Sequence, residues 1–400
     1  MKAGWEYRKL GDLCDIIGGG TPSKDNAFFY ENGTIPWATV RDMKSDVISE
    51  TEFMITEAAV KSSSTNIIPK GNVVIATRVG LGKVCLLAHD TAINQDLKGI
   101  IPKSTSVLSV GYLFQWFKNS AQIIIDEGTG ATVQGVKLPF IKSLIIPFPP
   151  LPEQQRIVTI LDEAFDGIAT AKANAEKNLQ NARALFDSHL QSVFSQRGEG
   201  WVEKQLSELC QKITKGSSPK WQGIGYVDKP GILFVTSENV GEFKLLMDKP
   251  KYVDEKFNEK DRKSILQHGD VLTNIVGASI GRTAVFNLDD IANINQAVCL
   301  LRCEPTLLNN HYLSYLLNSP VFRQILHDNE VDNARANLSL GFFSKLAVPW
   351  VSLSKQNDIV AKLDEFHAET HRLESIYQQK LSALDALKKS LLDQAFTGEL

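Results

Sequence analysis

The sequence predicts an α+β fold: two similar globular domains, each mixing strands and helices, separated by two long helices that pack as an antiparallel coiled coil with pseudo-twofold symmetry. One observation is a junction of apolar run, proline and helix start at 145–163, which recurs at 346–365. The other is a long stretch after each junction with apolar residues three and four positions apart, as in a coiled-coil seam. A repeat of this length is assigned first, because missing it gives the wrong fold.

The first globular domain is predicted over residues 1–149. Runs of branched apolar residues at 72–79 and 84–88 are typical of strands, and the glycines within 80–83 indicate the turn between them. The apolar run 144–146 is then the last strand before the junction.

The first long helix is predicted over residues 150–197 and the second over residues 350–400. About 40 residues at about 1.5 Å each make a rod of about 60 Å, whereas helices of ordinary globular domains seldom exceed about 20 residues. The first seam is rich in alanine and the second in leucine, so the two helices are expected to pack on each other. The seam positions are Ile157, Leu161, Ala164, Ile168, Ala171, Ala175, Leu179, Ala182 and Leu185, then Ile359, Leu363, Phe366, Thr370, Leu373, Tyr377, Leu381, Leu384 and Leu387.

The second globular domain, predicted over residues 198–349, repeats the landmarks of the first in the same order. Between these landmarks the two halves differ greatly, and a duplicated frame with divergent loops indicates two binding modules that recognise different things. An Asn-Gln pair recurs at 94–95 and 295–296 in both modules, so it is expected to have a role in the fold. The matched positions are Trp5 with Trp201, Cys14 with Cys210, Gly20 with Gly216, and Asn94-Gln95 with Asn295-Gln296.

Composition places the chain among ordinary globular proteins. Its 400 residues carry a formal net charge of −3, so a nucleic-acid face would have to be a local patch. The five cysteines show neither a CxxC pair nor metal-ligand spacing and fit a reducing cytoplasm. The N-terminus lacks an apolar signal region, and no run of about 18 apolar residues is present. We therefore expect a soluble, cytoplasmic protein.

The motifs of common catalytic sites are absent from the sequence. No GxxxxGK[ST] or GxGxxG motif is present to cradle phosphates. His367 and His371 lie one helical turn apart, a spacing that can hold a metal ion. No third ligand lies nearby in sequence, so we expect these histidines on a solvated face. The acidic pairs at 162–163 and 364–365 are assigned to the helix start, where negative charge favours the dipole.

Several stretches resemble the specificity (S) subunits of type I restriction-modification systems. The resemblance covers the whole chain and is most specific in the duplicated layout and in the junction PFPPLPEQQRIV…LD at 147–162. The segments 387–398, 130–139 and 334–339 also resemble the family pattern. The resemblance implies two target-recognition domains, each reading one half of a split DNA sequence, with the long helices holding them apart.

The resemblance also implies partners. The helices would dock two methyltransferase (M) subunits, and restriction (R) subunits would complete the nuclease. The S subunit itself would be non-catalytic and without a cofactor, while S-adenosylmethionine, ATP and Mg²⁺ belong to the partner subunits. The second junction departs from the pattern, with VSLSKQ at 351–356 in place of PPLPEQ, so its M-binding surface could differ. Candidate partner-binding residues are Gln154, Ile157, Leu161, Gln356, Ile359 and Leu363.

Candidate DNA contacts follow from the chemistry of the duplex. Lysine and arginine hold phosphates, while side-chain amides pair with base edges, above all adenine. Trp37 and Trp221 are either core residues or loop aromatics beside DNA, with the core favoured for Trp37. The phosphate candidates are Lys24, Arg41, Arg78, Lys83, Lys137, Lys220, Arg282 and Arg335, and the base candidates are Thr132, Gln134, Asn239, Asn274 and Asn337.

Two other function classes stay open at this point. A coiled-coil scaffold that joins proteins without touching DNA would bind its partners indifferently to salt, whereas phosphate contacts weaken steeply as salt rises. An enzyme with an unrecognised site would need a cluster of reactive side chains, and the sequence nominates none.

Overall fold

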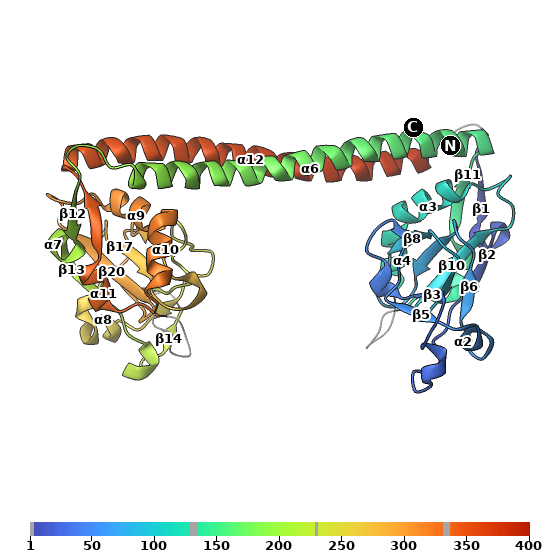
Figure 1. The fold of residues 1–400 in the computed structure, drawn as a ribbon, viewed down its shortest axis with the longest axis horizontal. Coiled ribbons are helices and arrows are strands. Elements are labelled where there is room, and N and C mark those ends of the chain that lie inside the picture. Colours follow the sequence, from blue (N-terminus) through green and yellow to red (C-terminus); the bar gives the residue numbers. More distant parts are fainter. Residues whose placement is uncertain (1–3, 129–134, 229–230, 331–336) are drawn as a thin grey trace. The chain divides into compact units, whose positions relative to one another are not determined.

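The computed structural model describes residues 4–128, 135–228, 231–330 and 337–400 (Figure 1). The chain forms two compact units, unit 1 from residues 1–176 with 379–400 and unit 2 from residues 177–378. Each unit contains one globular domain and a segment of both long helices. The predicted α+β class with a repeated domain is confirmed, although the division between units falls inside the helices. None of the described helices is both long and apolar enough to cross a membrane.

Unit 1 carries the first globular domain, which packs short helices on small sheets. Its strands are β1 Glu6–Lys9, β2 Cys14–Gly18, β3 Ile35–Ala38, β4 Val47–Ile48, β5 Phe53–Ile55, β6 Asn66–Ile68, β7 Val73–Ala76, β8 Val84–Leu87, β9 Thr91–Ile93, β10 Leu97–Pro102 and β11 Ile145–Phe148. Its shorter helices are α1 Leu10–Leu13, η1 Ala27–Phe29, η2 Val40–Asp42, α2 Glu57–Lys61, α3 Val110–Asn119, α4 Ala121–Asp126 and α5 Leu138–Ser143.

Unit 2 carries the second domain, built in the same order. Its strands are β12 Val202–Gln205, β13 Cys210–Lys215, β14 Tyr226–Val227, β15 Ile232–Val235, β16 Tyr252–Val253, β17 Val271–Asn274, β18 Thr283–Val285, β19 Ala292–Ile294, β20 Val298–Cys303 and β21 Ala347–Trp350. Its shorter helices are α7 Leu206–Leu209, η3 Pro219–Gln222, α8 Lys256–Lys260, η4 Arg262–Ser264, η5 Gly277–Ser279, α9 Asn310–Asn318, α10 Pro320–Asp328 and α11 Leu340–Lys345.

The main strands of the two domains correspond. The order β2-β10-β7-β8 in unit 1 matches β13-β20-β17-β18 in unit 2, with β4 as an additional fifth strand in unit 1, and the two-stranded pair β1-β11 matches β12-β21. The parallel pairing of β3 with β9 is repeated by β15 with β19. The frame that the sequence landmarks predicted is therefore duplicated in three dimensions.

One landmark was paired one position too late. Lys98 of β10 faces Gly18, while Cys299, its counterpart in β20, faces Lys215. The register of β13 shifts between Cys210 and Lys212, so a β-bulge inserts one residue. Gly216 is thus the counterpart of Gly19 rather than of Gly20. A Cβ on Gly19 or on Gly216 would lie within 2.5 Å of backbone oxygen at the end of the neighbouring strand, so both positions require glycine.

The long helices are α6, Leu151–Ser195, and α12, Leu353–Thr397, each of 45 residues. They run antiparallel within each unit. In unit 1, Arg156 contacts the carbonyl of Leu400, and the Lys172 ammonium lies 2.6 Å from Asp385. In unit 2, Arg183 lies 3.2 Å from Glu374, and the rings of His189 and Phe366 pack with centroids 4.6 Å apart. In both units the partner residue number falls as the α6 number rises, which is the antiparallel packing that the sequence predicted.

The predicted seam is right over most of its length and wrong at the last position of each helix. Ile168, Ala175 and Ala182 are buried, but Leu185 and Leu387 are about half exposed. Phe186, one position after Leu185, is buried instead. The seam moves because a helix turns 3.6 residues at a time, and a heptad spacing drifts off the buried face.

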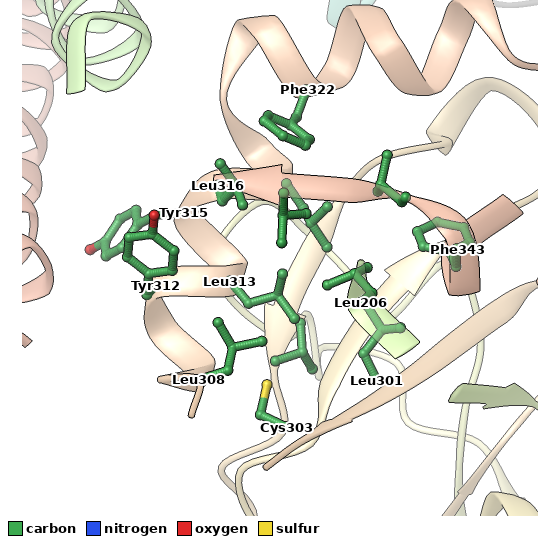
Figure 2. Close-up of a cluster of buried hydrophobic side chains, with 14 of the residues drawn as sticks. Leu206, Leu301, Cys303, Leu308, Tyr312, Leu313, Tyr315, Leu316, Phe322 and Phe343 are labelled. Atoms are coloured by element: carbon green, nitrogen blue, oxygen red, sulfur yellow. The ribbon is translucent and has the colours of Figure 1, made fainter. Parts of the chain in front are cut away.

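A phenylalanine at the far end of one long helix completes the core of each domain. In unit 2, Phe194 near the end of α6 packs on Tyr312 of α9, with ring centroids 5.4 Å apart. In unit 1, Phe396 near the end of α12 packs on Tyr112 of α3 at 5.2 Å. Figure 2 shows Tyr312 and Tyr315 at one edge of the unit 2 core, beside leucines of several elements. Each domain is thus closed by the helix that starts from the other domain.

Candidate nucleic-acid interface and its helical support

A buried glutamine fixes each globular domain to the start of its long helix. Gln154 Oε1 accepts a hydrogen bond from the backbone N–H of Ser109 at 2.8 Å, and its Nε2 donates to the carbonyls of Val107 and Pro149. Each of these three hydrogen bonds has a counterpart in unit 2, so the junction is repeated bond by bond. There Gln356 contacts the N–H of Asn309 at 2.8 Å and the carbonyls of Leu307 and Val351.

A second pair of hydrogen bonds holds the strands that lead into the long helices, β11 and β21, against α3 and α9. The hydroxyls of Tyr112 and Tyr312 donate to the carbonyls of Pro147 and Pro349, at 2.9 and 2.8 Å. Burial raises the pKa of both phenols, so both remain donors.

The acidic residues expected at the helix starts also serve this attachment. Asp162 accepts a hydrogen bond from Gln115 at 3.0 Å, and Asp364 accepts one from Tyr315 at 2.6 Å. Both carboxylates lie well inside their helices, so they bind the domain rather than the helix dipole.

These contacts correct the predicted partner-binding residues. Gln154, Gln356, Ile157, Leu161 and Leu363 are buried against their own domain, and Ile359 packs against the same core as Leu363. Side chains that are enclosed by contacts within their own chain are not available to bind another subunit. The repeated junction motif therefore reflects how each domain is attached to its helix. The prediction of partner contact is wrong for the five buried residues, and for the half-buried Ile359 it stays a prediction.

The first domain has a cleft of about 830 Å³ that collects several predicted residues. Lys24 and Arg41 line it together with the aromatic side chains of Tyr30, Trp37 and Phe53. Lys24 and Arg41 are exposed, whereas Trp37 is buried and donates its indole N–H to the carbonyl of Gly20. Trp37 is thus a core residue that forms a wall of the cleft, as the sequence favoured.

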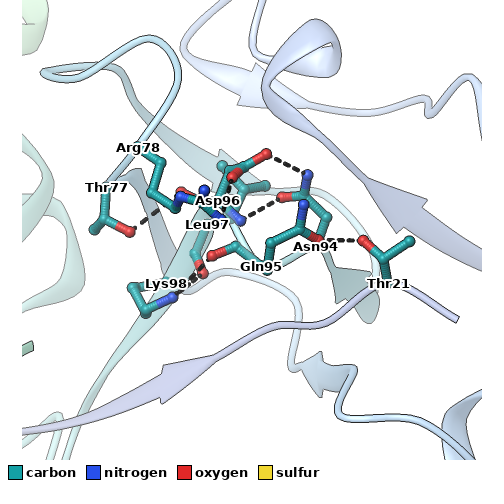
Figure 3. Close-up of polar contacts among 8 residues, drawn as sticks. All are labelled: Thr21, Thr77, Arg78, Asn94, Gln95, Asp96, Leu97 and Lys98. Atoms are coloured by element: carbon teal, nitrogen blue, oxygen red, sulfur yellow. Dashed lines mark hydrogen bonds and ion pairs between the residues drawn. The ribbon is translucent and has the colours of Figure 1, made fainter. Parts of the chain in front are cut away.

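A tight turn at Asn94 shapes the edge of this cleft (Figure 3). The Asn94 side chain accepts from the N–H of Asp96 and donates to the Asp96 carboxylate at 3.0 Å. Asn295 accepts from the N–H of Ala297 in the same way, which supports the predicted role in the fold. Gln95, by contrast, is exposed, lines the cleft and accepts from the hydroxyl of Thr21. The recurrence of the pair had assigned both residues to the fold, so Gln95 was not identified as a residue of the cleft.

Cations surround this turn. Arg78 lies 3.5 Å from Asp96, and Lys98 donates to the carbonyls of Gln95 and Leu97 at 3.1 Å (Figure 3). Burial lowers the pKa of the Lys98 amine, with the Asp96 carboxylate acting in the opposite direction. Lys83 is exposed and donates to the carbonyl of Met43 at 3.4 Å. The cleft and its edge therefore carry both cations and the carboxylates of Glu31 and Asp96 beside an aromatic wall.

Two of the base-contact candidates are wrong, because they are buried and hydrogen-bonded to backbone inside the second domain. Asn239 Oδ1 accepts from the N–H and hydroxyl of Thr236, and its Nδ2 donates to the carbonyl of Leu246. Asp42 accepts from the N–H and hydroxyl of Thr39 in the first domain, so both residues cap the same turn.

Asn274 likewise serves the fold. It is fully buried, and its Nδ2 donates to the carbonyls of Ser237 and Val240. A side chain enclosed in this way cannot reach a base edge.

The remaining candidates fall into three groups. Thr132, Gln134 and Arg335 lie outside the described residues. Lys137, Lys220 and Arg282 are exposed, and Asn337 is half-buried in a β-bridge with Val276. For Lys24, Arg41, Arg78, Lys83, Lys137, Lys220, Arg282 and Asn337, DNA contact stays a prediction that their accessibility allows.

Arg282 belongs to a second cavity, of about 490 Å³, between the second domain and its helices. Arg183, Phe186, Phe243 and His367 also line it. The ring of His367 packs on Phe186, with centroids 4.7 Å apart, and burial lowers its pKa. His367 therefore lies in an aromatic cluster rather than on the solvated face that the sequence predicted. Over the described residues, no group of three or more His, Cys, Asp or Glu could hold a metal ion.

Comparisons with known proteins agree with this geometry. A family model described as "Type I restriction modification DNA specificity domain" matches residues 2–180 and again 198–382. The chain is 36% identical over 170 residues to the EcoR124I/EcoR124II specificity subunit of Escherichia coli, covering 42% of each chain. It is 30% identical over 251 residues to the MjaIX specificity subunit of Methanocaldococcus jannaschii, covering 58% of this chain and 57% of that one. These alignments thus span about half of the length of these relatives.

Solved structures share the whole fold. A chain from a study of complex assembly and conformational transition of the type I R-M system superposes with a TM-score of 0.81 at 20% identity, covering 100% of this chain and 99% of the other. The HsdS subunit of Thermoanaerobacter tengcongensis gives a TM-score of 0.64 at 20% identity, covering 100% and 98%.

Proposed function

This chain belongs to the type I restriction modification DNA specificity family, and we propose that it is the DNA-sequence-recognition subunit of a type I restriction-modification complex. Each globular domain reads one half of a bipartite target in double-stranded DNA. The subunit itself carries no catalytic activity and no cofactor. Methylation and cleavage, with S-adenosylmethionine, ATP and Mg²⁺, belong to two methyltransferase subunits and to restriction subunits.

The single observation behind this proposal is a frame that repeats while its loops do not. The three junction hydrogen bonds of Gln154 recur at Gln356 with backbone groups at corresponding positions. The cleft of the first domain, in contrast, is lined mainly by residues of the loops in which the two sequences differ, among them Lys24, Tyr30 and Arg41, although the recurring Asn94-Gln95 pair also lines it. Two domains mounted identically but with different loop chemistry suit two different half-sites.

The long helices act as the spacer between half-sites and as the docking surface for the methyltransferase subunits. Half-sites read from one side of a duplex lie one or more helical turns apart, about 34–36 Å per turn. With the junction side chains buried, the outer faces of the helices are what a partner can touch. Leu185 and Ile376 in unit 2 and Leu387 in unit 1 are exposed apolar side chains on these faces.

The proposal is tested by purifying the chain with its methyltransferase partner and selecting bound duplexes from a randomised library. We expect enrichment of a bipartite sequence and a steep loss of affinity as salt rises. Replacing residues 1–149 by the corresponding domain of another specificity subunit changes only one half of that sequence. A library without enrichment, or binding that ignores salt, would instead favour a scaffold that joins proteins only.

The spacer role has its own test. Inserting one helical turn into α6 and one at the facing level of α12 keeps the pairing of the helices while lengthening both. We expect the gap between the half-sites to change and each half-sequence to stay the same. An unaltered gap would show that the helices do not set the spacing.

A further inference from the structure

Two large aromatic side chains project into solvent from the corresponding loop of each domain. Phe28 of η1 is 81% exposed and Trp221 of η3 is 78% exposed. Both turns belong to the loop that connects β2 to β3 in the first domain and β13 to β15 in the second. In Figure 1 each turn lies at the end of its domain opposite to the long helices. Isolated apolar side chains are ordinary on a surface, but here the exposure recurs in the same loop.

The backbone beneath Phe28 is held rigidly although its ring is free. The Asn26 side chain accepts from the N–H of Phe28 at 3.2 Å, and the Thr56 hydroxyl donates to the carbonyl of Phe28 at 3.1 Å. Tyr30 fastens the other side of the turn through a 2.7 Å hydrogen bond to the carbonyl of Pro22. A ring presented by a fixed backbone loses little conformational freedom when it binds.

Trp221 is mounted just as firmly. The backbone N–H of Trp221 donates to the carbonyl of Ser218, and Gly223 ends the turn with a φ of 71°. The next residue, Gln222, donates to the hydroxyl of Ser217, which in turn donates to the buried carboxylate of Asp261 at 2.6 Å. None of these contacts uses the indole, so replacing it leaves the turn intact.

Charge beside the rings points to a polyanion as the partner. Lys220 is next to Trp221, and Lys260 Nζ reaches the carbonyl of Gln222 at 2.8 Å. In the first domain the turn lies on the edge of the cleft, because Lys24, Ala27 and Tyr30 line that cleft. Asp25 and Glu31 flank this turn as well, so its net attraction for phosphate is weaker than that of the second turn.

We propose that Phe28 and Trp221 stack on bases of the bound duplex, each as an aromatic wedge at the half-site of its own domain. This inference rests on the proposed function. Apolar side chains inserted at a base step unstack it and bend the duplex, and an aromatic ring contributes roughly 1–3 kcal/mol per stacked base. The contact tolerates any base, so it would add affinity and shape-dependence to the sequence reading by the loops.

The test uses the complete complex with its methyltransferase partner and duplexes that carry 2-aminopurine at successive positions of each half-site. A wedge unstacks the probe and raises its fluorescence at one position per half-site. Trp221→Ala should abolish the signal in one half-site only and lower affinity roughly 5- to 150-fold. Phe28→Ala should do the same for the other half-site, and Trp221→Phe should restore most of both signal and affinity.

Matched variants separate this contact from a general loss of binding. Ile123→Ala removes an exposed apolar side chain from α4, outside these loops, and should leave affinity and probe signal unchanged. If the wild-type complex selects a bipartite sequence and Trp221→Ala and Phe28→Ala bind it normally, the wedge proposal is wrong while the proposed function stands. If the wild-type complex selects no sequence, the proposed function itself fails.

Discussion

Asp46 in the first domain and Phe243 in the second each lie four residues after the residue that caps a matched turn, Asp42 and Asn239. The carbonyl of Asp46 accepts a hydrogen bond from the N–H of Leu86, whereas the N–H of Phe243 donates to the carbonyl of Thr283. Asp46 forms an ion pair with Lys118 of α3, near Lys388 of α12. Phe243 instead packs its ring against Phe186 of α6 and His367 of α12.

The difference teaches which contacts the duplication preserves. The glutamine and tyrosine contacts at the junction are the same in both units, whereas this loop forms an ion pair with α3 in the first domain and packs an aromatic ring on α6 and α12 in the second. An ion pair near the surface contributes about 0–1 kcal/mol, but a packed aromatic ring contributes several times more. In the second domain this loop is therefore an additional attachment to the long helices.

The largest expected effect tests the shared junction. Gln154→Ala and Gln356→Ala each leave buried backbone groups unpaired, so we expect a loss of about 3–5 kcal/mol in the free energy of unfolding of the affected unit. Gln356→Ala should be the milder change, because the indole of Trp350 also donates to the carbonyl of Leu307. Denaturant titration measures both, and the exposed neighbours Gln155→Ala and Lys355→Ala serve as controls, within about 0.5 kcal/mol of wild type. Equal stability of variant and control would mean that the junction does not support the domains.

The next effect tests the contrast itself. Phe243→Ala should cost about 2–3 kcal/mol of stability, since it empties a half-buried aromatic contact. Asp46→Ala should cost less than about 1 kcal/mol. Phe243 also adopts a φ of 62°, which disfavours every residue with a Cβ. Phe243→Gly should therefore be at least as stable as Phe243→Ala, contrary to the usual order, and thermal unfolding of the three variants decides between these outcomes.

A smaller effect concerns the capping residue of the turn before this position. Asn239 accepts from Thr236 and donates to Leu246, whereas Asp42 accepts from Thr39 and from the N–H of Glu52. Exchanging the two types, as Asp42→Asn and Asn239→Asp, sets donor against donor or acceptor against acceptor. We expect about 1–2 kcal/mol lost in each case. Two fully stable variants would show that the turns are interchangeable.

The smallest effect is a pH dependence confined to the second unit. Burial, with His371 nearby, lowers the pKa of His367 below its ordinary value of 6.5, while Asp364 and Glu374 act in the opposite direction. The folded state thus favours the neutral ring, so its stabilising contribution is complete above pH 6.5 and is lost as the pH falls through the lowered pKa. His367→Phe should flatten this part of the stability profile. His89→Gln, in the first domain, should leave it unchanged.

The sequence predicted the repeat, the long helices and the antiparallel pairing because spacing of apolar residues carries that information directly. It failed at positions where the sequence alone does not say which way a side chain points. Asn239 and Asn274 carry the side-chain amide that can read a base edge, yet both amides donate hydrogen bonds to backbone carbonyls of their own domain. Gln154 and Gln356 were predicted to bind a partner subunit because they repeat, but the repeat reflects how each domain is attached to its long helix.

The site was harder to predict than the frame, since its residues come from loops that meet only after folding. Lys24, Arg41 and Gln95 are far apart in the chain but line one cleft. The β-bulge in β13 likewise could not be read from the sequence. It adds one residue to the strand, so Gly216 corresponds to Gly19 and not to Gly20. From the sequence, Trp221 was a candidate loop aromatic beside DNA, but Phe28, four residues after Lys24 in the corresponding loop, was not recognised.

The packing of Phe396 on Tyr112 has a consequence for biosynthesis. Unit 2 is one continuous stretch, whereas the core of unit 1 includes Leu392, Ala395 and Phe396. During translation the core of the first domain stays incomplete until the second domain and the end of α12 have been synthesised. The N-terminal domain is therefore synthesised first but completes its folding last, which exposes it longest to proteases and chaperones in the cell.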